Sequence, residues 1–97
     1  MNRNINEIKY QISNICNALL RNINNNFISV SFDFVSNDDT LVKVILEKKT
    51  EVEDDYIEDM IAELAASQQS DCVKKPQIEV GNQHTPLRNL VYQKFVN

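Results

Sequence analysis

Apolar residues recur at steps of three and four near the start of the chain, and this spacing predicts a helix over residues 4–23. Its apolar face consists of Ile5, Ile8, Ile12, Ile15, Cys16, Leu19 and Ile23. Because Cys16 falls on this face, we expect it to be a small buried hydrophobic residue. The run of Asn at 24–26 ends the helix, since Asn tolerates the left-handed backbone conformation that closes many helices.

The next segment, residues 27–35, changes to a period of two, which predicts a half-buried strand. Its apolar face consists of Ile28, Val30, Phe32 and Phe34. A polar turn at 36–39 and a second alternating run at 41–47 complete a predicted β-hairpin. The second run also carries Leu41 and Ile45 on its other face, so we expect this strand inside the sheet and not at an edge.

A second helix is predicted over residues 51–69. Thr50 followed by Glu53 forms a capping box, in which each side chain satisfies a backbone N–H of the other residue. The buried side of this helix consists of Ile57, Met60, Ile61, Leu64, Ala65 and Gln68. Lys74, Lys75 and Pro76 then break the pattern. A short strand at 77–80, a loop at 81–86 and a closing strand at 87–96 are expected to form a second hairpin.

The element order αββαββ predicts an α+β fold. We expect a two-layer sandwich in which two helices pack on one face of a mainly antiparallel four-stranded sheet, with residues 1–97 as a single domain. No apolar run is long enough for a membrane span, and the amino terminus lacks the apolar core of a signal peptide. Two cysteines are too few for a disulfide framework, so free thiols and a cytoplasmic location are expected.

The charge of the chain is concentrated in the second helix. Seven of the 14 acidic residues lie within residues 51–63, where there is no Lys or Arg, so this stretch carries −7. The rest of the chain, with ten basic and seven acidic residues, sums to +3. A near-neutral protein with one acidic element is typical of a surface that attracts a basic partner.

An advance of 100° per residue places Asp55, Asp59 and Glu63 opposite the apolar side of this helix, flanked by Glu51 and Glu58. Like charges four residues apart cost the helix roughly 1–2 kcal/mol in total. We therefore predict a docking face for a cationic protein, where complementary charge speeds encounter. A solvated surface helix is the alternative.

Tyr56 lies at the border of this face, where we predict that it anchors the partner. Its alternative role is to cover the edge of the core.

No catalytic motif is present, and we expect neither a cofactor nor a metal, because carboxylates on one helix lack the loop geometry of Ca²⁺ and Mg²⁺ sites. The only histidine, His84, lies in a polar loop without an evident orienting partner. Direct binding of nucleic acid is not expected either, since the acidic helix would repel phosphates. A small enzyme that uses Asp33, Asp38, Asp39 or His84 remains an alternative.

The chain resembles the small immunity proteins of bacterial contact-dependent growth-inhibition and colicin-type toxin systems. The acidic helix EVEDDYIEDMIAELAASQ and the closing segment LRNLVYQKFVN carry this resemblance. It implies a non-enzymatic protein that occludes a cognate toxin, and many such toxins are basic nucleases. The site expected for the toxin consists of Glu51, Asp55, Tyr56, Glu58, Asp59 and Glu63. An acidic adaptor or regulatory module that uses the same face on another basic protein is the alternative.

Overall fold

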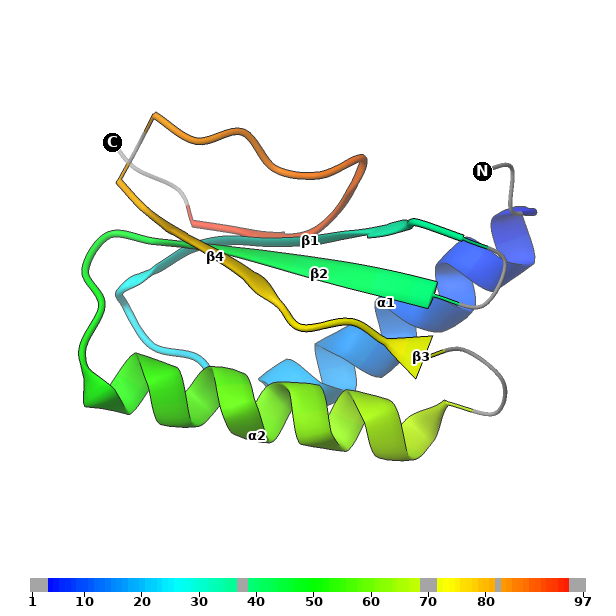
Figure 1. Ribbon diagram of the computed structural model, residues 1–97, viewed down its shortest axis with the longest axis horizontal. Helices are drawn as coiled ribbons and strands as arrows, with labels where there is room; N and C mark the ends of the chain where they lie inside the picture. Colours follow the sequence, from blue (N-terminus) through cyan, green and yellow to red (C-terminus); the bar gives the residue numbers. More distant parts are fainter. Residues whose placement is uncertain (1–3, 37–38, 69–71, 82, 95–97) are drawn as a thin grey trace.

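The computed structural model describes residues 4–36, 39–68, 72–81 and 83–94. Helix α1 (Ile5–Leu19) begins at Asn4, whose side chain accepts a hydrogen bond of 2.9 Å from the backbone N–H of Glu7. Helix α2 (Glu51–Ser67) begins with the predicted capping box. Both helices lie on the same side of the sheet (Figure 1). In the described residues, no helix combines the length and apolar character that a membrane crossing requires.

The predicted hairpin of β1 (Phe27–Phe34) and β2 (Asp39–Leu46) is confirmed, because the two strands pair antiparallel with Phe32 opposite Val42. Strand β5 (Asn89–Gln93) pairs antiparallel with the other side of β1. Strands β3 (Cys72–Val73) and β4 (Gln77–Val80) both run parallel to β2. Strand β2 therefore lies inside the sheet, as its two apolar faces predicted.

The prediction of a four-stranded, mainly antiparallel sheet in the order αββαββ is wrong, although the α+β class and the two helices are found. The sheet has five strands and mixes parallel with antiparallel pairs. After β2 the chain passes through α2, and the strands that follow the helix lie beside β2. A helical crossover of this kind makes the two neighbouring strands parallel. Pro76, which lacks a backbone N–H, lies between the two short pieces β3 and β4 at the edge of the sheet.

The second predicted hairpin, between 77–80 and 87–96, is wrong as well. Strand β4 pairs with β2 and β5 pairs with β1, so the two strands lie at opposite edges of the sheet. The segment 83–88 carries the chain from one edge to the other over the face that lacks helices (Figure 1). On that face Lys43 Nζ donates to the carbonyl of Thr85 at 2.6 Å, and the backbone N–H of Leu87 donates to Ser31 Oγ at 2.8 Å.

The hydrophobic core lies between the helices and the sheet. Its buried residues are Ile15, Ala18, Leu19, Phe27, Val30, Phe32, Phe34, Val42, Val44, Leu46, Ile57, Met60 and Leu64. Cys16 is exposed, contrary to the prediction, and Gln11 is buried on the same helix instead. Phe27 is buried because the β1–β2 register shifts between Phe27 and Ser29.

Candidate functional site

The acidic residues of α2 divide into groups with different surroundings. The core side of the helix is formed by Ile57, Met60 and Leu64, which are at most 2% exposed. At 100° per residue, Asp55 and Asp59 point away from this side into solvent. The predicted acidic face therefore exists as an exposed surface, but not every acidic residue of the helix belongs to it.

Glu53 has a structural role. Its side chain is 1% exposed, and its carboxylate accepts hydrogen bonds from the backbone N–H of Thr50 at 2.7 Å and from Asn24 Nδ2 at 2.7 Å. The bond from Asn24, followed by those from Thr50, lowers the pKa of Glu53 to about 2. This carboxylate fastens the start of α2 to the loop that follows α1.

Five further carboxylates of α2 are exposed. They are Glu51, Asp55, Glu58, Asp59 and Glu63. Asp54 lies 3.5 Å from Lys49 Nζ, whereas none of the five forms a salt bridge with any residue that the structure describes. The last turn of α2 contains no basic residue either. Their negative charge is therefore directed at solvent.

The side chains of the predicted site residues lie on different sides of α2. Glu51, Asp55 and Asp59 lie on the outward side of α2, which we call the outward face. Glu63 borders a depression between the two helices that includes Arg21, in the turn after α1. Tyr56 is half-buried and packs against the core, so its role in covering the core edge is observed.

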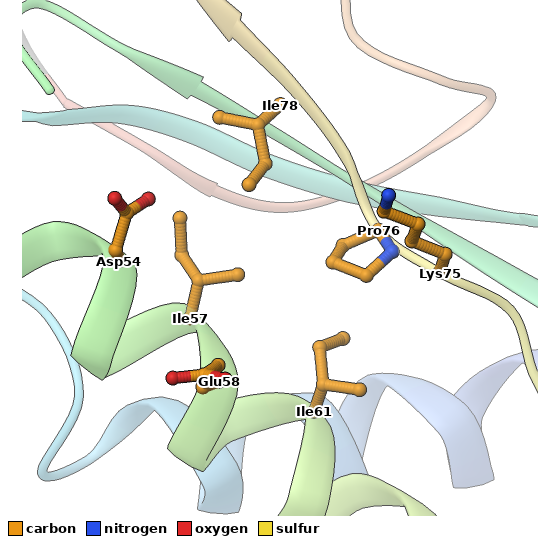
Figure 2. A pocket seen from close by; sticks show the side chains of 7 residues that line it. All are labelled: Asp54, Ile57, Glu58, Ile61, Lys75, Pro76 and Ile78. Carbon is orange, nitrogen blue, oxygen red and sulfur yellow. The ribbon is translucent and has the colours of Figure 1, made fainter.

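Glu58 lines a groove between α2 and the β3–β4 edge of the sheet, which we call the α2–β4 groove. The groove encloses about 560 Å³. Its lining residues are Asp54, Ile57, Glu58, Ile61, Lys75, Pro76 and Ile78 (Figure 2). Sequence reasoning missed this groove because it paired 77–80 with 87–96 and so removed Ile78 from the neighbourhood of α2.

The residues considered for a small enzyme do not converge. His84 Nε2 lies 3.1 Å from the carbonyl of Val80, and its Nδ1 lies 3.7 Å from Glu79. Strand β4 places this pair at one end of β2, whereas Asp39, in a salt bridge of 3.5 Å with Lys74, lies at the other end, about 20 Å away along the strand.

The hydrogen bond from Ser36 is the main cause that lowers the pKa of Asp39. Asp33 accepts a hydrogen bond from the backbone N–H of Phe34. Asp38 is outside the described residues. Within the described ranges, no three His, Cys, Asp or Glu side chains are grouped so that they could hold a metal ion.

A comparison with protein families identifies one match over nearly the whole chain. The family model described as MafI2 immunity protein matches residues 9–96. Among curated proteins, none matches the chain significantly.

Proposed function

The chain belongs to the MafI2 immunity protein family, so its partner is a cognate toxin, and we propose that it neutralises this toxin by occluding a basic surface with α2. In this proposal the contacts are made by Glu51, Asp55, Tyr56, Glu58, Asp59 and Glu63. The protein binds stoichiometrically in the cytoplasm and catalyses no reaction.

The observation that carries the proposal is the set of five exposed carboxylates of α2 that form no salt bridge with the described residues. Their mutual repulsion costs the helix stability, because like charges four residues apart are unfavourable. A basic partner removes this repulsion. It also gains from the field of the helix during encounter, since complementary charge raises association rates.

A nuclease is the toxin class that this surface fits best. A nuclease domain holds its substrate with Lys and Arg side chains that bind phosphates. The carboxylates along the helix carry negative charge as the phosphates of a nucleic acid do, so they compete with the substrate for these Lys and Arg side chains. We propose a nuclease toxin of the kind found in contact-dependent growth-inhibition systems, encoded directly upstream of this chain.

The test measures the association rate with the cognate toxin domain across ionic strength. The variant Asp55→Asn/Asp59→Asn/Glu63→Gln removes three charges from α2. The matched control Asp33→Asn/Glu47→Gln/Glu79→Gln removes three charges elsewhere, so the two variants have equal net charge. Between about 0.01 and 1 M salt the screening length falls from about 30 to about 3 Å, which spans the range in which steering disappears.

We expect the α2 variant to associate roughly tenfold more slowly at low salt and to lose most of its salt dependence, while the control resembles the wild type. Equal effects of both variants would show that net charge alone matters. A wild-type association rate that does not change with salt would reject steering by α2.

A further inference from the structure

The α2–β4 groove is a place where the two layers of the fold separate. The backbone of α2 comes close to β3, but β4 diverges from the helix as it runs along β2 (Figure 1). Ile61, Pro76 and Ile78 are therefore only partly buried, and their side chains point into one space above Ile57 (Figure 2). The groove offers an apolar floor, and its volume of about 560 Å³ lies in the range of about 300–1,000 Å³ typical of ligand pockets.

Two carboxylates stand at one side of this floor. Asp54 and Glu58 are four residues apart on α2, so they lie one helical turn from each other and repel. Lys49 lies 3.5 Å from Asp54, but Glu58 has no salt bridge within the described part of the chain. Lys75 lies on the opposite wall beside Pro76 and forms no salt bridge with either carboxylate (Figure 2).

We propose that the α2–β4 groove receives an arginine side chain of the cognate toxin. Such a side chain has an apolar stem and a cationic end, and the groove has an apolar floor and an acidic rim. The methylene groups pack on Ile61, Pro76 and Ile78, while the guanidinium donates hydrogen bonds to Glu58. A guanidinium is flat and weakly hydrated, so it fits this half-buried position better than the ammonium group of lysine.

This inference rests on the proposed function, because it names one anchor of the same toxin. It adds a division of roles. The outward face acts at long range and changes the association rate, whereas a side chain held in the groove is in close contact and changes the dissociation rate.

The test uses a probe that does not require the toxin. The ¹⁵N-labelled full chain is titrated with N-acetyl-arginine-methylamide at constant ionic strength, and amide chemical shifts are followed by NMR. The uncharged analogue N-acetyl-citrulline-methylamide has the same length and shape. We expect saturable shifts at Ile57, Glu58, Ile61 and Ile78. The citrulline probe should bind about two- to fivefold more weakly, because an exposed ion pair contributes only a small part of the binding free energy.

Two charge-neutral variants locate the contact. Glu58→Gln is expected to weaken the arginine probe by the same two- to fivefold factor. Asp33→Asn, which removes one charge on the other side of the sheet, is expected to leave probe binding unchanged. Glu58 is exposed, so its substitution does not remove a core contact.

Equal binding of the two probes would overturn the proposed selection of arginine, and so would equal weakening by both variants. Shifts confined to the outward face, or no saturable shifts, would overturn the groove as the arginine site. These outcomes leave the proposed function intact, because that proposal is judged by the toxin association rates. A wild-type association rate that does not change with salt, with arginine still bound in the groove, would reject the outward face alone.

Discussion

Two carboxylates of the same helical turn have opposite roles. Glu53 is buried and accepts hydrogen bonds from Thr50 and Asn24, whereas Asp55 is exposed and makes no salt bridge with the described residues. The sequence predicted the bond from Thr50, because a capping box is a local pattern. The bond from Asn24 joins residues 29 positions apart, and no local pattern reveals it.

Glu53→Gln is expected to lower the free energy of unfolding near about pH 7, because a neutral amide replaces a carboxylate that accepts several hydrogen bonds. Since the folded pKa of Glu53 is lowered from 4.5 to about 2, its stabilising effect is present above pH 4.5 and is lost as the pH falls toward 2. The difference between variant and wild type should therefore shrink across this interval in urea denaturation followed by circular dichroism. A difference that stays constant with pH would contradict this assignment.

Gln11 is a buried residue that the periodic pattern overlooked. It lies on the same face of α1 as Ile8 and Ile15, at the step of three or four residues that marks the face, but its polar side chain excluded it from the apolar set. In the structure, Gln11 Nε2 donates to Thr40 Oγ1 at 3.0 Å and to Gln68 Oε1 at 2.7 Å. The Gln68 amide donates back to Gln11 Oε1 at 3.1 Å, so one side chain connects α1 with β2 and with the end of α2.

Gln11→Ala is expected to reduce the free energy of unfolding by about 1–3 kcal/mol, because the buried hydroxyl of Thr40 and the partly buried amide of Gln68 lose this partner. The control Asn17→Ala removes an exposed amide elsewhere on α1 and should cost less than about 0.5 kcal/mol. Chemical denaturation of the three proteins checks the difference. Equal losses for both variants would mean that the effect comes from the helix and not from the buried network.

At the scale of elements, α2 combines a stabilised start with a destabilised exposed surface. Its cap and its length agree with the sequence pattern, since both depend on neighbours within about four residues. Its predicted buried side is confirmed at Ile57, Met60 and Leu64, whereas Ala65 is exposed. The surroundings of the helix could not be predicted in this way. Parallel pairing of β4 with β2 depends on the path of the chain through space, and this pairing creates the groove beside Glu58.

Asp59→Lys is expected to raise the free energy of unfolding by about 0.5–1.5 kcal/mol, because it converts the repulsive pairs with Asp55 and Glu63 into attractive ones. The same variant should associate more slowly with the toxin. Asp59→Asn serves as the intermediate case and should show about half of the gain. A loss of stability in Asp59→Lys would indicate that Asp59 makes an interaction that the fold requires.

At the scale of the whole molecule, the sheet has two long central strands and shorter strands at its edges. Strands β1 and β2 are paired on both sides, whereas β3 and β4 are short pieces at one edge and β5 forms the other edge. The central hairpin was predictable because its two strands are adjacent in the sequence. The edges were not, because each is paired with a strand that is distant in the sequence.

Native-state hydrogen exchange is expected to follow this arrangement. Amides in the centre of β1 and β2 should be the most protected, because their exchange requires global unfolding. Amides of β3 should exchange fastest among the strands, since an edge strand of two residues opens without disturbing the core. NMR-detected exchange of the full chain checks this order. Protection of β3 equal to that of β2 would show that the edge unfolds together with the core.

If the toxin binds as proposed, the outward face of α2 also determines how this immunity protein can follow changes in its toxin. Glu51, Asp55 and Asp59 form no salt bridge with the rest of the described chain, so exchanging them leaves the cap, the core and the sheet intact. When a toxin alters its basic residues, matching substitutions on this helix can accumulate one at a time, and every intermediate still folds. Specificity in the proposed complex then depends on exposed positions outside the core, and one fold can serve many toxin variants.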